Sequence, residues 1–304
     1  MTSPAMSLAR RRPVSERIIE GTLFLAAAIG VLTTIGIIIV LTEETLQFFG
    51  QVSPIDFFTG TVWSASIKPY TFGVLALVSG TVLVAGIAIL IAVPLGLLAA
   101  VYLAEYATPR VRTIVKPILE TIAGIPTIVI GFFGLYFVVP YILKPLIGED
   151  NIGTFSALAG GIMVGFLITP LIASISEDAM RAVPRGMREG AFAMGATNFE
   201  VVRKVVIPAA LSGIMASVIL AASRAIGETM AVVLLVGTQP QLTLDPLQSV
   251  QTMTAFIIQI SLGDTPQDSV QFRSLFAVAA TLFSMTLALN LISNRIVSRF
   301  KVAY

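Results

Sequence analysis

Six stretches of this 304-residue chain are predominantly apolar and long enough to cross a lipid bilayer as helices. A helical crossing needs about 20 residues of this kind. Because hydrocarbon offers no hydrogen-bond partner to an open backbone, each crossing segment must close its own hydrogen bonds as a helix. The expected spans are residues 18–41, 74–102, 114–139, 155–175, 209–236 and 274–296. The predicted fold class is therefore all-α, a polytopic membrane protein with six transmembrane helices.

The composition supports this class and excludes several kinds of chemistry. Hydrophobic residues make up 56% of the chain and charged residues only 12%, more apolar surface than a water-soluble domain of this size can use. There is no Cys and no His, which excludes disulfides, thiol nucleophiles, a Cys/His zinc site and His-based acid–base catalysis. The first apolar run lacks a small-residue cleavage site and is too long for a signal-peptide core, so we expect it to be a retained anchor.

Lys and Arg gather on one side of the expected spans. That side holds 15 of them: Arg10, Arg11, Arg12, Arg17, Arg110, Arg112, Lys116, Arg181, Arg185, Arg188, Arg203, Lys204, Arg295, Arg299 and Lys301. The opposite side holds three, Lys68, Lys144 and Arg273, and Arg224 lies within a span. Because positively charged loops stay in the cytoplasm, both termini are expected to be cytoplasmic.

This topology divides the chain into four segments. We expect a cytoplasmic N-terminal segment at 1–17, a first transmembrane helix with its outward loop at 18–73, a transmembrane core at 74–296 and a cytoplasmic tail at 297–304. Within the core, residues 176–208 form a polar, amphipathic cytoplasmic loop between the fourth and fifth spans.

The loop at 176–208 contains residues that are typical of the starts and ends of two short helices. Pro184 suits a first helical turn, and Gly195 suits a helix end because it accepts a left-handed backbone. Thr197 and Glu200 have the spacing of a capping box, which would start a second helix, and Pro208 ends that helix or starts the next span. Such a helix–turn–helix either lies on lipid headgroups or docks a protein, and physical arguments alone favour neither.

The fifth expected span contains the charged residues Arg224 and Glu228. They are four residues apart, which places them on one face of a continuous helix. A charge inside a span is costly and is a functional candidate by default. Arg224 could offer a bidentate, permanently charged fork to a passing oxyanion, with Glu228 orienting it and keeping the anion from binding too tightly. The alternative is a mutually neutralising pair that only fixes helix packing.

The spacing of the loop resembles the EAA loop of ABC importer membrane subunits. That pattern is Glu-Ala-Ala, three residues, Gly, nine residues and Ile-x-Leu-Pro. The sequence has Glu189-Gly190-Ala191, then Gly195-Ala196, then Val205-Val206-Ile207-Pro208 at the same intervals. Gly190 replaces the second residue of the triplet. The resemblance implies that Glu189, Gly190, Ala191, Gly195, Ala196 and Pro208 belong to a loop that couples to a cytoplasmic ATPase.

Further segments resemble the permeases of phosphate-specific ABC importers. They are Ala92-Val93-Pro94-Leu95-Gly96, Tyr102-Leu103-Ala104-Glu105-Tyr106-Ala107, Ala123-Gly124-Ile125-Pro126 and Arg224-Ala225-Ile226-Gly227-Glu228-Thr229-Met230-Ala231-Val232. The Met-Ala-Val ending is similar to the PstC type of these permeases. The resemblance implies a type I importer (MetI-like) fold in a bacterial plasma (inner) membrane, and places Arg224 and Glu228 on a path for inorganic phosphate.

The same resemblance implies a set of partners. They are a second permease (PstA-like), two copies of a cytoplasmic ATP-binding subunit (PstB-like) and an extracytoplasmic phosphate-binding protein (PstS-like). The chain has no Gly-x-x-x-x-Gly-Lys-Ser/Thr phosphate loop, so it is expected to be a transport subunit without a cofactor, and ATP hydrolysis is assigned to the partners. The alternatives are a permease for another oxyanion such as sulfate or molybdate, an ion-coupled carrier, and a non-transporting membrane scaffold.

Overall fold

The computed structural model describes residues 14–65 and 68–299, so Arg10, Arg11, Arg12 and Lys301 of the predicted cytoplasmic segments lie outside the described residues. The elements before the loop are α1 (Val14–Phe49), α2 (Pro54–Thr59), β1 (Trp63–Ser64), β2 (Thr71–Phe72), α3 (Leu75–Val101), the π-helical turn η1 (Tyr102–Tyr106), α4 (Pro109–Ala123), α5 (Thr127–Phe133), the π-helical η2 (Gly134–Leu143), α6 (Lys144–Ile147) and α7 (Ala157–Arg181). They are followed by α8 (Arg185–Ala193), α9 (Asn198–Val201), the π-helical η3 (Val202–Val206), α10 (Ile207–Ile226), α11 (Met230–Leu235), α12 (Met253–Leu262) and α13 (Val270–Arg299).

The described residues contain six helical stretches long and apolar enough to span a membrane. They are Glu16–Phe49, Leu75–Tyr106, Thr127–Ile147, Ala157–Arg181, Asn198–Ile226 and Val270–Ser293. This confirms the predicted all-α, six-span fold class. The only sheet among the described residues is the antiparallel pair β1–β2, with Trp63 opposite Phe72.

The centre of the molecule is the packing of α3 against α7. Three glycines of these helices allow close approach, because a Cβ at Gly96 would lie 2.8 Å from Ile172, one at Gly161 would lie 2.5 Å from Ile87, and one at Gly165 would lie 3.1 Å from the carbonyl oxygen of Ala88. The buried cluster around them extends to α10 and α11. Helix packing in a membrane relies on such small residues, and α3–α7 therefore form the scaffold against which α10 and α11 pack.

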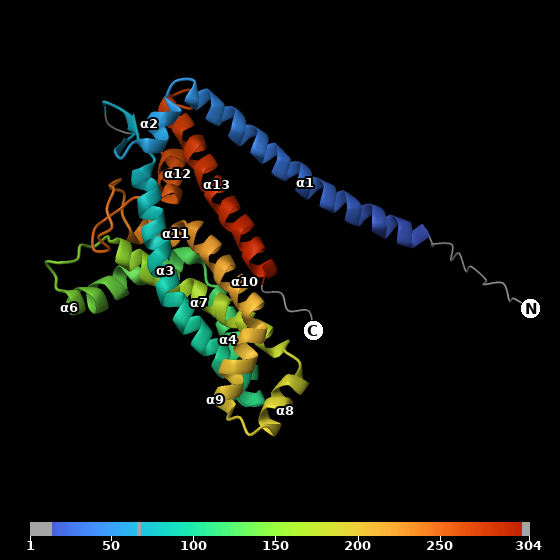
Figure 1. The fold of residues 1–304 in the computed structure, drawn as a ribbon. Helices are drawn as coiled ribbons and strands as arrows, with labels where there is room; N and C mark the ends of the chain where they lie inside the picture. Colours follow the sequence, from blue (N-terminus) through green and yellow to red (C-terminus); the bar gives the residue numbers. More distant parts are fainter. Residues whose placement is uncertain (1–13, 66–67, 300–304) are drawn as a thin grey trace, which may run out of the picture.

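One end of the bundle is covered by an aromatic cap. The end of α1, the short helix α2, the β1–β2 pair and α12 meet there (Figure 1). Trp63 packs edge-to-face on Phe256 of α12 with ring centroids 4.8 Å apart, and Phe48 packs on Phe57 and Phe72 in the same way. Away from this cap α1 leaves the bundle, and none of its most apolar stretch is buried (Figure 1).

The third span differs from its predicted position at 114–139. Residues up to Ala123 form the separate amphipathic helix α4, which ends at Gly124, and the span itself begins at Thr127. Pro126 lies between the two helices and cannot donate the backbone hydrogen bond that would join them. Within the span, a Cβ at Gly131 would lie 2.9 Å from Leu234 and one at Gly134 would lie 2.8 Å from Met163, so both glycines serve close helix packing.

Two further boundaries require correction. The span before the loop continues to Arg181, so the first six residues of the loop predicted at 176–208 belong to α7. The outward segment predicted after residue 236 is not only a loop, because it contains the apolar helix α12. At ten residues α12 is about half as long as a membrane span, so span length could not reveal it.

Candidate coupling tip and transport path

The predicted helix–turn–helix is present as α8 and α9, at the end of the molecule opposite the aromatic cap (Figure 1). Gly195 follows α8 with a φ of +86°, a backbone region that side chains with a Cβ rarely adopt. The Oγ1 of Thr197 accepts from the backbone N–H of Glu200 at 3.4 Å, and the Glu200 carboxylate accepts from the N–H of Thr197 at 3.0 Å. The predicted helix stop and capping box are both confirmed.

The second helix of the loop is not a separate element. The backbone stays helical through Val202 and Ile207, so α9, η3 and α10 form one 29-residue helix, Asn198–Ile226. At 1.5 Å per residue it is about 43 Å long. Pro208 lies in the first turn of α10, and α8 begins one residue after Pro184. The loop end is therefore continuous with the fifth span.

We call residues 182–201 the α8–α9 tip. Of the predicted coupling residues, Ala191 is buried and Ala196 half-buried, whereas four are exposed: Glu189, Gly190, Gly195 and Pro208. Ala191 packs with Val201 and Val206 beneath the tip. Ala191 thus packs α8 against the fifth span, while Glu189 remains exposed and available to a partner.

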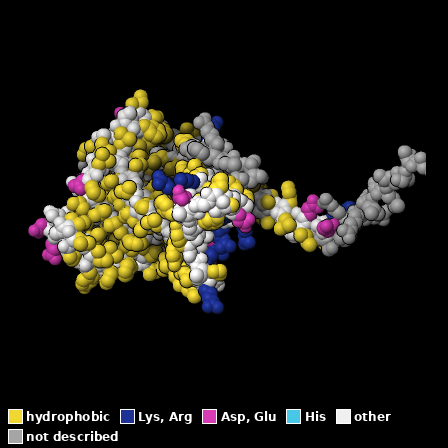
Figure 2. All heavy atoms as spheres, turned by 60° about the horizontal axis from the view of Figure 1, so that its bottom comes forward, with side chains coloured by type: hydrophobic (Ala, Val, Ile, Leu, Met, Phe, Trp, Pro, Cys, Tyr) yellow, Lys and Arg dark blue, Asp and Glu magenta, His cyan; other side chains and the backbone are white. Residues whose placement is uncertain are grey.

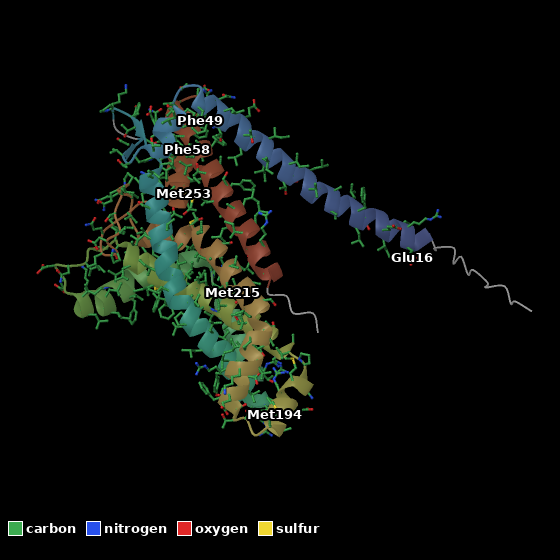
Figure 3. All side chains as sticks on the ribbon, in the orientation of Figure 1. Glu16, Phe49, Phe58, Met194, Met215 and Met253 are labelled. Atoms are coloured by element: carbon green, nitrogen blue, oxygen red, sulfur yellow. The ribbon has the colours of Figure 1, made fainter. Side chains whose placement is uncertain are left out.

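Large apolar side chains are exposed on the α8–α9 tip. Met187 is 39% exposed, Phe192 46%, Met194 85% and Phe199 62%. Met194 lies at the extreme end of the molecule (Figure 3). In the view from this end, Lys and Arg side chains gather near the tip (Figure 2), and Arg185, Arg203 and Lys204 are exposed there. An apolar patch rimmed by polar residues is typical of a docking surface.

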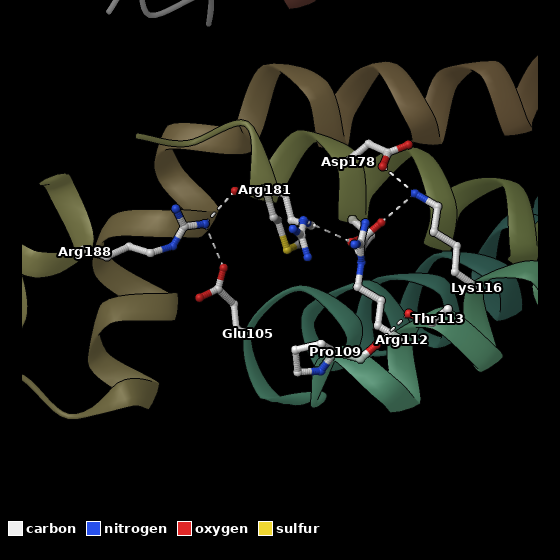
Figure 4. A network of polar contacts seen from close by, with 10 residues as sticks. Glu105, Pro109, Arg112, Thr113, Lys116, Asp178, Arg181 and Arg188 are labelled. Carbon is white, nitrogen blue, oxygen red and sulfur yellow. Dashed lines mark hydrogen bonds and ion pairs between the residues drawn. The ribbon is translucent and has the colours of Figure 1, made fainter. Parts of the chain in front are cut away.

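Arg188 anchors the tip to the membrane-spanning part. Its Nη2 donates to the carboxylate of Glu105 in η1 at 2.9 Å and to the carbonyl of Met180 at 2.8 Å, and its Nη1 donates to the carbonyl of Val183 (Figure 4). Arg188 is 16% exposed and Glu105 7%. In the sequence Arg188 contributes only to the positive charge of the loop. Its neighbours on α8 are exposed and Glu105 is 83 positions away, so no local pattern predicts this bond.

A second ionic cluster joins α4 to the end of α7 (Figure 4). The side chain of Glu177 is fully buried and accepts from Arg112 Nε at 2.6 Å and Lys116 Nζ at 2.8 Å, with Arg181 Nε 3.7 Å away. Lys116 also pairs with Asp178. Burial lowers the pKa of Lys116, but its hydrogen bonds and proximity to Asp178 and Glu177 outweigh that effect and raise the pKa above its ordinary value. Lys116 therefore remains a cation at neutral pH and compensates the buried carboxylate.

The fifth span is broken at the predicted path residues. Helix α10 ends at Ile226 with Gly227 as its cap, Glu228 and Thr229 are not helical, and α11 begins at Met230. The prediction that Arg224 and Glu228 share one helix face is therefore wrong, because the helix ends between them. Among the described residues no ion pair joins the two side chains.

Arg224 and Glu228 have different surroundings. Arg224 is half-buried in the last turn of α10. Glu228 is 8% exposed, and its carboxylate accepts a long hydrogen bond of 3.5 Å from the backbone N–H of Ala231 at the start of α11. A cavity of about 680 Å³ lies elsewhere, between the α1–α2 turn, α2 and the β1–β2 segment of the aromatic cap. One of about 480 Å³ adjoins the break and is lined by Gly227, Thr229, Met230, Thr254, Ile257, Ile258 and Leu282. Among the described residues no group of His, Cys, Asp or Glu is placed to hold a metal ion.

Curated relatives match most of the chain. A probable ABC transporter permease protein of Bacillus subtilis, YqgH, is 36% identical over 91% of this chain and 89% of its own length. The phosphate transport system permease protein PstC of Mesorhizobium japonicum is 32% identical over 95% of this chain and 92% of its own length. The PstC of Haemophilus influenzae is 30% identical over 85% of this chain and 84% of its own length.

Solved structures show the same fold. A bacterial alginate ABC transporter, in complex with a pentasaccharide-bound periplasmic protein, matches with a TM-score of 0.66 over 95% of this chain and 97% of that chain at 15% identity. The inward-facing methionine ABC transporter MetNI matches with a TM-score of 0.56 over 76% of this chain and 95% of that chain at 20% identity. These likenesses identify the type I importer permease (MetI-like) fold.

The family model for the "binding-protein-dependent transport system inner membrane component" matches residues 92–302, which include the α8–α9 tip and the broken fifth span. The chain therefore belongs to this family of ABC importer permeases, as a multi-pass membrane subunit related to the PstC proteins.

Proposed function

We propose that the chain is the PstC-type permease of an ATP-driven importer of inorganic phosphate. The observation that supports phosphate as the transported substrate is the match to proteins named as phosphate transport permeases. In the Mesorhizobium relative this match extends over 95% of this chain. The Bacillus relative is named only as a probable ABC permease, so the cargo rests on the PstC relatives. The two solved structures, at 15% and 20% identity, support the architecture of the permease and do not indicate its substrate.

Arg224 supports an anion path in this proposal. It carries a permanent charge inside a span, and among the described residues no carboxylate forms an ion pair with it. Its guanidinium can therefore offer two parallel hydrogen bonds to a phosphate. Glu228, four positions further on and across the break, is the acidic residue that would keep the anion weakly bound, as transport requires.

The α8–α9 tip supports coupling to ATPase subunits. Its exposed apolar side chains and basic rim would enter a cleft of a cytoplasmic ATP-binding subunit, two copies of which hydrolyse ATP for the complex. A PstA-like permease would complete the path, and a PstS-like phosphate-binding protein would deliver the anion at the aromatic cap. This arrangement places the tip and both termini in the cytoplasm, in agreement with the Lys and Arg count.

The test is uptake by the whole complex in a bacterial strain that lacks its own phosphate importers. Expressed with its partner subunits, the chain should restore uptake of radiolabelled phosphate, and excess sulfate or molybdate should not compete. Arg224→Ala should reduce uptake by about ten- to hundredfold, the factor expected for losing hydrogen bonds to a charged group, while the four-component complex still purifies in normal amount. Competition by sulfate or molybdate would contradict phosphate as cargo, and failure of the Arg224→Ala complex to assemble would assign Arg224 to packing.

A further inference from the structure

The break in the fifth span leaves the backbone carbonyl of Glu228 without a helical donor. Its hydrogen-bond donor among the described residues is the hydroxyl of Thr254 in α12, at 2.9 Å. Both residues are buried, Glu228 at 8% exposed and Thr254 at 5%. A buried carbonyl without a partner is costly inside a membrane, so the Thr254 hydroxyl stabilises the unwound turn.

The hydroxyl of Thr254 is itself held in place. Since its proton goes to Glu228, its oxygen accepts from the hydroxyl of Thr252, 3.1 Å away. The oxygen of Thr252 in turn accepts from the backbone N–H of Ala255 at 3.2 Å, as the N-cap of α12. The three hydrogen bonds therefore all point the same way: the Ala255 N–H donates to Thr252, Thr252 donates to Thr254, and Thr254 donates to the carbonyl of Glu228.

The start of α12 is fixed to the central scaffold. The N–H of Met253 donates to the Oγ1 of Thr81 in α3 at 3.0 Å, and Thr81 donates to the carbonyl of Leu77 at 2.9 Å. Gly80 lets the loop before α12 lie directly on α3, because a Cβ there would be 2.5 Å from the carbonyl oxygen of Gln251. A continuous set of contacts therefore runs from α3 through α12 to the broken turn.

We propose that Thr254 is a positioning residue for transport, a role that rests on the function proposed above. Its hydroxyl holds the main chain of Glu228 and so fixes the turn between Arg224 and Glu228, the two charged groups of the path. Arg224 sits on the helix that is continuous with the α8–α9 tip, whereas Glu228 is attached through Thr254 to α12 and α3. Thr254 thus sets where the carboxylate lies relative to the guanidinium.

Replacing the hydroxyl by a methyl group tests this role. In the whole complex, Thr254→Val should lower the maximal rate of phosphate uptake by about tenfold or more, the factor expected for a lost hydrogen bond to a buried carbonyl. The phosphate concentration giving half-maximal uptake should stay unchanged, because the extracytoplasmic binding protein sets it. Thr254→Ser keeps the hydroxyl and should restore the rate to within about twofold of wild type.

The matched control is Thr281→Val on α13, whose hydroxyl, within the part of the chain that the structure describes, bonds to the carbonyl of Ala277 in its own helix at 2.8 Å and to no other helix. This variant should transport normally. Wild-type rates in Thr254→Val, or an equal loss in Thr254→Ser, would overturn the positioning role. If Thr254→Val does not assemble, the Ser variant decides: normal uptake supports a need for the hydroxyl, and loss contradicts it. If wild type moves another oxyanion, the function proposal fails and the Thr254 series is measured with that ion.

Discussion

Arg188 and Glu105 join the α8–α9 tip to the end of the second span through a 2.9 Å hydrogen-bonded ion pair that is largely buried. The two backbone carbonyls that Arg188 also holds, those of Met180 and Val183, lie at the end of α7 and in the turn that follows it. One side chain therefore connects α8 to two spans. A force applied to α8 would reach both of them without crossing a flexible linker.

Replacing Arg188 should release α8. Arg188→Gln leaves the Glu105 carboxylate buried without its cation, which costs about 3–5 kcal/mol, and should lower the unfolding temperature of the purified permease and its ATP-driven uptake. Glu105→Gln keeps the two carbonyl hydrogen bonds and should cost less. Arg185→Gln, an exposed change on the same helix, is the control and should leave the unfolding temperature unchanged. Equal stability in the Arg188 and Arg185 variants would contradict the anchor.

Two glycines of the tip should respond in opposite ways to the same substitution. Gly195→Ala places a Cβ on a backbone with φ +86° and should cost about 1–2 kcal/mol, weakening co-purification of the ATPase subunit. Gly190→Ala lies within α8 with no neighbouring atom within 4 Å of the new Cβ and should stabilise the helix by about 0.5–1 kcal/mol. Thermal unfolding of both variants, with ATPase pull-down, is the measurement. A destabilised Gly190→Ala variant would show that the tip is packed differently.

The two acidic residues at the end of α7 offer a similar comparison. Glu177→Gln removes the buried charge shared by Arg112 and Lys116 and should destabilise the permease by about 3–5 kcal/mol, since Arg112 loses its carboxylate partner and Lys116 keeps only Asp178. Asp178→Asn affects a side chain that is 61% exposed, where an ion pair contributes about 0–1 kcal/mol. Unfolding midpoints in detergent separate the two. If both variants unfold alike, the Glu177 cluster does not hold α4 on α7.

The sequence predicts those parts of this molecule that depend on neighbouring residues. Span length and apolarity identify six membrane helices, and the Gly195 stop and the Thr197–Glu200 box each involve residues within one turn. The break after Ile226 is hidden because the apolar run continues through Met230–Leu235, so a continuous helix is the simpler prediction. The ionic clusters are hidden for another reason: Glu177 lies 65 positions from Arg112 and 61 from Lys116, and only the packing of α4 on α7 brings them together.

The last prediction concerns the packing of the start of α12 on α3. Gly80→Ala would place its Cβ 2.5 Å from the carbonyl oxygen of Gln251 and 3.2 Å from that residue's carbonyl carbon. The contact is with backbone, so the start of α12 must shift, and overpacking of this kind costs about 1–3 kcal/mol. The shift would lengthen the Thr254–Glu228 hydrogen bond, so uptake should fall together with stability.

Gly86→Ala, six residues further along α3, is the matched control because no atom lies within 4 Å of its added Cβ. Alanine is also the better helix former, so this variant should be at least as stable as wild type and transport normally. The comparison is made by thermal unfolding and phosphate uptake in the same membranes. Because the two substitutions add the same methyl group to the same helix, a loss confined to Gly80→Ala identifies the α3–α12 contact as its cause, and equal behaviour of the two variants would contradict it.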